Sequence, residues 1–172
     1  MLKQKISEEI KKALQNKDEL LLLVLRGINA AIHNKEIEKR TKLCKTSVFA
    51  EAPADKEKLK KLEEESKLTE DETIEVIASE AKKRKESIVE FEKGGRQDLV
   101  NKETAELEII KKYLPEQMSE DAVKEIVKKA IEETGAVGPK DIGKVMAKIM
   151  PQVKGKADGS LVSKIVGELL KG

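Results

Sequence analysis

The chain has 172 residues, of which 40% are charged, and its 35 basic and 33 acidic side chains leave a net charge of only +2. Because the net charge is close to zero, it does not by itself indicate nucleic-acid binding. Any such indication depends on how charge is distributed locally. Aromatic residues make up 2% of the chain and Trp is absent, so the core must consist of Leu, Ile, Val, Ala and Met.

The first part of the chain predicts two helices. Apolar residues at helical spacing form a first helix that ends at a break over residues 16–18, where Asp18 is a good N-cap for the next helix. The second helix is expected to run to about Arg40. Its first half, Leu20–Leu25, is apolar on every face. A helix that is apolar all round is expected to be buried all round, at the centre of the N-terminal half.

Residues 41–68 differ in composition from what precedes them. Thr41–Phe49 is mixed, Pro53 is expected to break the chain, and Asp55–Lys67 consists almost entirely of Lys and Glu. We expect either a peripheral helix or a mobile insertion here, and we assign this segment little function.

Two further long helices follow. Thr69 and Glu72 have the spacing of a capping box, which predicts the start of a third helix, and Gly94-Gly95 is expected to end it. A fourth helix is expected to run to Leu114, where Pro115 stops it. Pro115 is also the predicted domain boundary.

Three short helices are predicted beyond this boundary. Ser119 is the expected N-cap of the first, and Gly135 its C-terminal stop. Pro139 is expected to open the second, which ends near Pro151, and Asp158 is the expected N-cap of the third. These three short helices, together with the longer helices before them, predict the fold class.

The predicted fold is all-α. A long-helix N-terminal domain is expected over residues 1–115, with a charged insertion at 41–68. A small three-helix bundle is expected over residues 116–172.

No catalytic or metal-binding residue can be assigned from the sequence, and no cofactor is expected. Cys44 and His33 lack partners of the right type nearby, and no phosphate-binding or metalloprotease motif is present. Whether the chain is an enzyme stays open, although the lack of a self-contained active site favours a non-enzymatic role. With no signal peptide, transit peptide or membrane span recognised, we expect a cytoplasmic protein without a membrane partner.

Basic clusters are the remaining candidate sites. The Lys82–Lys85 cluster lies mid-helix and is interpreted as a solvated face. Residues 116–135 carry six acids and three lysines, whereas residues 136–172 carry seven lysines and three acids, a local net charge of +4. Lys140, Lys144 and Lys148 recur every four residues and predict one basic stripe on a helix.

The connection after this stripe contains Lys154 and Lys156. Gly155 and Gly159 would allow close approach to the backbone, and Asp158 begins a helix there, so the connection could contact phosphate. An ordinary tight loop with exposed lysines explains the same residues, and composition alone does not decide between the two.

Several motifs together resemble the YqeY family, small bacterial proteins of the GatB/YqeY group. The motifs are Gly143-Lys144-Val145-Met146, Met150-Pro151, Lys154-Gly155-Lys156-Ala157-Asp158-Gly159, Leu161-Val162, Phe91-Glu-Lys-Gly-Gly-Arg-Gln-Asp98 and Tyr113-Leu-Pro-Glu-Gln117. The resemblance extends to the first two helices and covers nearly the whole chain except roughly residues 41–68. Within it, the expected structural positions are Gly143, Pro151, Gly155, Asp158 and Gly159.

The resemblance implies a link to tRNA-dependent amidation. The C-terminal module is similar to the GatB tail domain of tRNA-dependent amidotransferase, which helps to hold tRNA while Glu-tRNA(Gln) or Asp-tRNA(Asn) is amidated. The family is described as having carbon–nitrogen ligase activity with glutamine as amido-N-donor, but this chain lacks the kinase-like and glutaminase parts. We therefore expect an accessory protein that binds tRNA or another structured RNA through Lys140, Lys144, Lys148, Lys154 and Lys156.

The alternative is a helical adaptor without direct RNA binding. In this case the long N-terminal helices would present a groove to part of an amidotransferase or of an aminoacyl-tRNA synthetase. Protein partners that persist after nuclease treatment would distinguish the adaptor from the RNA-binding protein.

Overall fold

The structure is a computed structural model that describes residues 2–46 and 56–170, and every regular element in these ranges is a helix. The predicted all-α fold is therefore confirmed. Contacts divide the chain into two compact units, Met1–Tyr113 and Leu114–Gly172, called unit 1 and unit 2 below.

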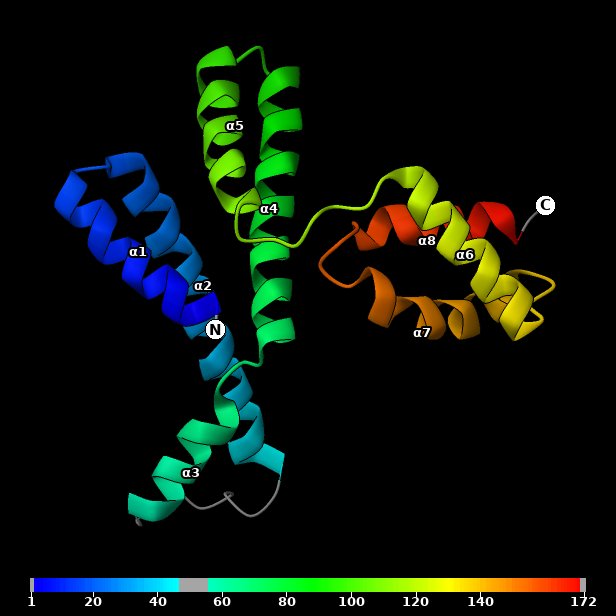
Figure 1. Cartoon of the computed structure of the whole chain (residues 1–172), viewed down its shortest axis with the longest axis horizontal. Helices are drawn as coiled ribbons and strands as arrows, with labels where there is room; N and C mark the ends of the chain where they lie inside the picture. Colours follow the sequence, from blue (N-terminus) through cyan, green and yellow to red (C-terminus); the bar gives the residue numbers. More distant parts are fainter. Residues whose placement is uncertain (1, 47–55, 171–172) are drawn as a thin grey trace. The chain divides into compact units, whose positions relative to one another are not determined.

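Unit 1 consists of two antiparallel helix pairs and one shorter helix (Figure 1). Helix α1 pairs with α2, α4 pairs with α5, and the shorter α3 packs against α2. The helices are α1 (Leu2–Asn16), α2 (Glu19–Thr46), α3 (Lys56–Ser66), α4 (Glu70–Lys93) and α5 (Gln97–Lys111).

Helix α2 begins as predicted but differs from the prediction in length and burial. The Asp18 side chain accepts a hydrogen bond from the Leu21 N–H at 3.0 Å, as an N-cap does. The helix continues to Thr46, six residues beyond the predicted end, because no Gly or Pro lies between Arg40 and Thr46. The prediction of burial on all sides is wrong: Leu20 and Leu23 are 38% and 53% exposed, since the neighbouring helices cover only one side of α2.

The segment predicted as a charged insertion contains packed helix. The second half of this segment forms α3, whose Leu62 is buried and whose Ser66 Oγ donates to the Glu63 carbonyl at 2.9 Å. Thr41–Thr46 therefore continue α2, and α3 is the expected peripheral helix. The predicted break at Pro53 and the end of Thr41–Phe49 lie outside the described residues.

The start and end of α4 follow the predicted local signals. The Glu72 N–H donates to the Thr69 hydroxyl, and the Thr69 N–H donates to the Glu72 carboxylate, which completes the capping box. The helix ends at Lys93, before the two glycines. Helix α5 ends three residues before the predicted Leu114, and Tyr113 is buried after it.

Charged side chains join the helices of unit 1. Arg84 of α4 contacts Glu103 at 3.2 Å and Glu106 at 2.8 Å on α5, and Glu106 is almost completely buried. On the other helix pair, Lys3 Nζ donates to both carboxylate oxygens of Glu36 at 2.7 Å. These contacts fix the register within each helix pair.

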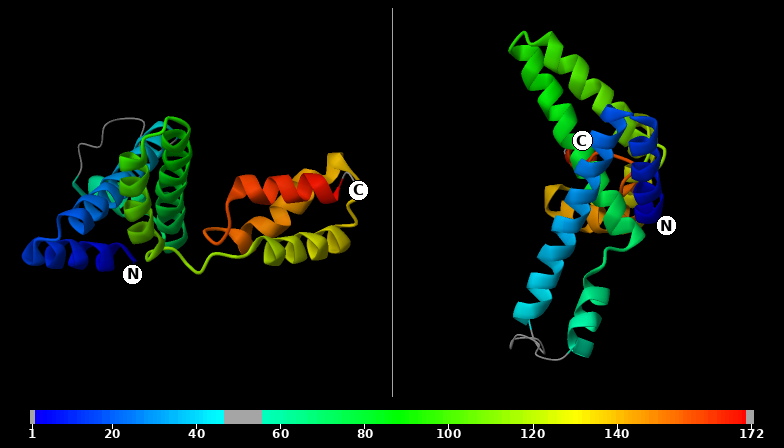
Figure 2. Two further views of the ribbon diagram at one scale, coloured as in Figure 1. Left: turned by 90° about the horizontal axis from the view of Figure 1, so that it is seen from above. Right: turned by 90° about the vertical axis from the view of Figure 1, so that its left-hand side faces the viewer.

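Unit 2 is a three-helix bundle with an aliphatic core (Figure 2). Its elements are α6 (Glu120–Thr134), the 3-10 turn η1 (Pro139–Asp141), α7 (Ile142–Val153) and α8 (Gly159–Leu169). The buried core residues are Val123, Val127, Ala130, Ala136, Val145, Ile149, Val153, Val162, Ile165, Val166 and Leu170.

The ends of the helices in unit 2 largely match the predicted signals. Ser119 Oγ accepts from the Ala122 N–H at 3.2 Å, and Gly135 caps α6 in the left-handed conformation. Two details differ from the prediction. Pro139 opens a 3-10 turn rather than the α-helix itself, and Pro151 lies inside α7, which continues to Val153.

Candidate functional site

The predicted lysine stripe lies on η1 and α7 of unit 2. Lys140 is exposed in the 3-10 turn, and Lys144 and Lys148 lie one turn apart on α7. The side chains of Lys144 and Lys148 are 72% and 50% exposed, so the two ammonium groups are accessible to solvent. The structure therefore places these two lysines on one exposed helix face.

Two carboxylates lie against this stripe. Lys144 Nζ is 2.9 Å from Asp141 Oδ1, and Lys148 Nζ is 3.0 Å from Glu133 Oε2 on α6. The hydrogen bond from Lys144, with a second from the Val137 N–H, lowers the pKa of Asp141 below its ordinary value. Counting charges by segment had assigned Glu133 to the acidic half of the module, so its proximity to Lys148 was missed.

The connection between α7 and α8 follows directly after the stripe. Lys154 caps the end of α7, and Gly155 has a φ of 72°, a conformation that glycine adopts without strain. Asp158 Oδ1 accepts from the Ser160 N–H at 2.7 Å and caps α8, as the sequence predicts. Lys154 and Lys156 are therefore separated by one residue whose backbone conformation favours glycine.

This connection is tied to the segment that precedes α6. Gln117 Nε2 donates to the Gly155 carbonyl at 2.9 Å, and the Met118 N–H donates to the Lys156 carbonyl at 2.7 Å. Two motifs that lie about 38 residues apart in the sequence therefore meet in space. These bonds fix the backbone that carries Lys154 and Lys156.

The other predicted structural positions have less demanding surroundings. A Cβ built at Gly143 or Gly159 would meet no atom within 4 Å, and neither residue has a positive φ. Packing within unit 2 therefore does not require glycine at either position. Pro151 is exposed on α7 and removes one helical hydrogen bond there.

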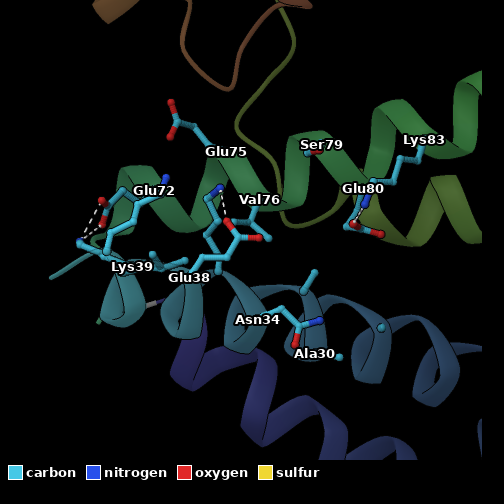
Figure 3. A pocket seen from close by; sticks show the side chains of 15 residues that line it. Ala30, Asn34, Glu38, Lys39, Glu72, Glu75, Val76, Ser79, Glu80 and Lys83 are labelled. Atoms are coloured by element: carbon cyan, nitrogen blue, oxygen red, sulfur yellow. Dashed lines mark hydrogen bonds and ion pairs between the residues drawn. The ribbon is translucent and has the colours of Figure 1, made fainter. Parts of the chain in front are cut away.

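Unit 1 contains an open groove between α2 and α4 (Figure 3). Its volume is about 810 Å³. Ala30 and Asn34 of α2 and Val76 and Ser79 of α4 line its middle, and charged side chains line its two walls. The adaptor alternative expects a groove on the long N-terminal helices, but a helix α2 buried on all sides would not line one, so the sequence did not predict these lining residues.

The single His and the single Cys of the chain both lie on α2. His33 is exposed, and Cys44 is half-buried. Within the ranges 2–46 and 56–170, no group of three or more His, Cys, Asp or Glu side chains is arranged to hold a metal ion. None of the helices in these ranges is long and apolar enough to cross a membrane.

Together these features define a class, an all-α protein with a paired-helix unit and a three-helix unit whose exposed face carries lysines. Residues 52–170 match the family described as Yqey-like protein. The chain belongs to this family. The match includes α3, so the prediction that residues 41–68 depart from the family is wrong for residues 52–68, and the match does not extend to the first two helices.

Three relatives share the name Altered inheritance of mitochondria protein 41, mitochondrial. The chain is 36% identical over 98 residues to the protein from Pyrenophora tritici-repentis. The aligned residues cover 55% of this chain and 54% of the relative. For Kluyveromyces lactis the identity is 31% over 63% of this chain and 45% of the relative. For Lachancea thermotolerans it is 34% over 63% of this chain and 46% of the relative.

This chain thus spans about half the length of the relatives that it matches. All three are named as mitochondrial proteins, which contradicts the prediction of a cytoplasmic protein. The prediction failed because it was reached by elimination: the absence of a recognised targeting or membrane segment does not identify a compartment.

Proposed function

We propose that this protein binds tRNA or another structured RNA through Lys140, Lys144, Lys148, Lys154 and Lys156, as an accessory factor in tRNA-dependent amidation. The observation that supports this proposal most directly is the arrangement of these lysines within unit 2. Three follow one another at four-residue intervals, and two lie in a connection whose backbone is held by Gln117 and Met118. A fixed backbone reduces the entropy lost when the side chains bind phosphate.

The carboxylates beside the stripe do not prevent such binding. Lys144 and Lys148 are well exposed, and exposed ion pairs typically contribute only about 0–1 kcal/mol. A phosphate can therefore replace Asp141 or Glu133 at little cost. Because aromatic residues are scarce in the chain, recognition is expected to use the RNA backbone and shape rather than base stacking.

The test is binding of labelled tRNA, followed by fluorescence anisotropy over a salt series. Replacing both Lys154 and Lys156 with Glu is expected to weaken binding by at least roughly tenfold and to lower the slope of log affinity against log salt by about 2. These residues are exposed or half-exposed in the connection, so the fold should persist.

The matched control replaces Lys128 and Lys129 with Glu. Both residues are exposed on α6, in the acidic part of unit 2, and the change in net charge is the same. This control should bind RNA within about twofold of the unmodified chain. An equal loss in both variants, or binding that does not depend on salt, would argue against a specific basic face.

The role in amidation rests on the family resemblance of unit 2 and needs its own test. A purified amidotransferase acting on mischarged tRNA is assayed with and without the chain. We expect the chain to lower the tRNA concentration needed for half-maximal rate and the Lys154 and Lys156 double variant to lose this effect. No change in rate at any tRNA concentration would remove amidation from the proposal while leaving RNA binding intact.

A further inference from the structure

One face of α2 carries apolar and small residues at alternating spacings of three and four. These residues, called the α2 seam here, are Leu20, Leu23, Gly27, Ala30, Asn34 and Ile37, and all six are exposed. Leu20, Leu23 and Ile37 are among the most exposed large apolar residues, at 38%, 53% and 43%. A mean spacing of 3.5 residues is the pattern by which one helix packs along another.

The surface beside the seam is open to a further helix. Ala30 and Asn34 also line the groove between α2 and α4, where Val76 and Ser79 of α4 face them (Figure 3). No large side chain of α2 fills the middle of the seam, because residues 27 and 30 are Gly and Ala. A second helix could therefore approach α2 closely at this point.

Side-chain sizes at the centre and at the ends of the seam match when the seam is read in the opposite direction. Small residues occupy the centre, at Gly27 and Ala30, and large aliphatic residues occupy the ends, at Leu20 and Ile37. When such a seam meets a copy of itself in the antiparallel direction, the small central residues face each other and the large end residues face each other. That arrangement allows close packing at the centre and at the ends, and Asn34 is the one polar residue in the seam.

We propose that the α2 seam binds the α2 seam of a second copy of this chain, antiparallel, with the two-fold axis passing between Gly27 and Ala30. Each interface of this kind is symmetric, so every contact occurs twice. Leu20 then packs against Ile37 of the partner subunit, and Leu23 packs beside Asn34 of the partner subunit.

One pair of charges that flank the seam is complementary in this register. Glu19, the first residue of α2, lies beside Arg40 of the partner subunit. Flanking charges of this kind select partner and orientation in paired helices.

The extent of the seam sets the expected strength of the dimer. Residues 20–37 of a helix span about 26 Å. One pair of helices of this length buries less surface than a standard stable interface of about 1,600 Å². The dimer should therefore dissociate on dilution rather than behave as an obligate assembly.

The first test is sedimentation equilibrium of the full chain over roughly 1–200 µM. The unmodified chain is expected to shift from monomer to dimer in this range, and Leu23→Glu should weaken dimerisation by at least about tenfold. Leu14→Glu is the matched control, because Leu14 is also exposed but lies on α1, outside the seam. A chain that stays monomeric throughout, or an equal effect of both variants, would overturn the proposal.

The second test determines the register by disulfide cross-linking in a Cys44→Ser background. A mixture of chains carrying Leu23→Cys and Asn34→Cys should form a cross-linked heterodimer on oxidation, whereas Leu23→Cys alone should not. Efficient cross-linking of Leu23→Cys with itself would indicate a parallel pair and would overturn the proposal. A chain that stays monomeric and uses this face only to bind a helix of another protein would also overturn the proposal. The outcome is independent of RNA binding, which the lysines of unit 2 are proposed to provide.

Discussion

The two units differ in what accompanies their apolar cores. In unit 1 buried apolar side chains such as Ile28 and Ile77 are accompanied by buried or half-buried charges, and the four buried polar residues of the described ranges, Glu36, Ser66, Thr73 and Glu106, all lie there. The core of unit 2 is aliphatic, and its ion pairs lie at the surface. Charged contacts therefore add to register in unit 1, whereas the shapes of Val, Ile, Ala and Leu side chains specify it in unit 2.

A single residue makes this comparison measurable. Tyr113 is the only tyrosine, Trp is absent, and the Tyr113 ring is buried in unit 1, where its hydroxyl donates to Glu9. Tyrosine fluorescence therefore reports on unit 1, while circular dichroism reports on the helices of both units.

The largest effect is expected from a cavity in the core of unit 2. Ile149→Ala removes a completely buried side chain and should lower the free energy of unfolding of unit 2 by about 3 kcal/mol. Circular dichroism should then show an early transition that tyrosine fluorescence does not follow. Met150→Ala, at the exposed neighbouring position, is the control and should change little. An early shift of the tyrosine signal would show that the units do not unfold separately.

A somewhat smaller effect is expected when a charged contact of unit 1 is broken. Arg84→Met leaves the buried Glu106 carboxylate without its guanidinium, which should cost about 2 kcal/mol because Arg84 is partly exposed. This loss should appear in the tyrosine-detected denaturation curve. Adding Glu106→Gln should restore part of the stability, since no charge then remains buried. A double variant less stable than Arg84→Met would contradict this account.

The third prediction concerns the backbone of the connection in unit 2. Gly155→Ala places a Cβ at a φ of 72° and should cost about 1–2 kcal/mol. Gly159→Ala should have no such cost, because Gly159 is helical and a Cβ there meets open space. Thermal denaturation followed by circular dichroism compares the two variants. Equal destabilisation would mean that both glycines are needed for their conformation.

The smallest effect is the acid sensitivity of unit 1. Burial alone would raise the pKa of Glu36, but hydrogen bonds from Lys3 and the Leu68 N–H lower it overall. A lowered pKa in the folded state stabilises unit 1 above the ordinary glutamate pKa of about 4.3. This contribution is lost as pH falls from there through the folded-state pKa.

The contribution should be about 0.5–1 kcal/mol, because Lys3 is partly exposed. It is measured as the fall in tyrosine-detected stability from neutral pH to about pH 3.5. The fall should be smaller in Glu36→Gln. A variant with the same pH dependence as the unmodified chain would exclude Glu36 as a cause.

Features that depend on neighbours in the sequence could be predicted without the structure. The caps at Asp18, Thr69, Ser119 and Asp158 each require only a side chain and an N–H two or three residues away. The glycine stop at Gly135 is local in the same sense. The all-α class follows, since helical periodicity and helix ends are both encoded over short stretches.

Features that depend on distant residues could not be predicted. The exposure of Leu23 depends on which side of α2 the other helices cover, and hydrophobicity alone gave the wrong answer. The contact of Lys148 with Glu133 joins two helices that composition had treated as separate charge regions. The candidate RNA-binding lysines were found from the sequence, but whether they bind RNA stays a prediction.

The hydrogen bond from Met118 to the Lys156 carbonyl has a consequence for amide exchange with D₂O. Met118 precedes α6, where an amide without a helical partner would ordinarily exchange rapidly. At 2.7 Å from its acceptor, this N–H should exchange slowly, at the rate set by opening of the α7–α8 connection. The exchange rate of the Met118 amide would thus report how often the backbone that carries Lys154 and Lys156 opens.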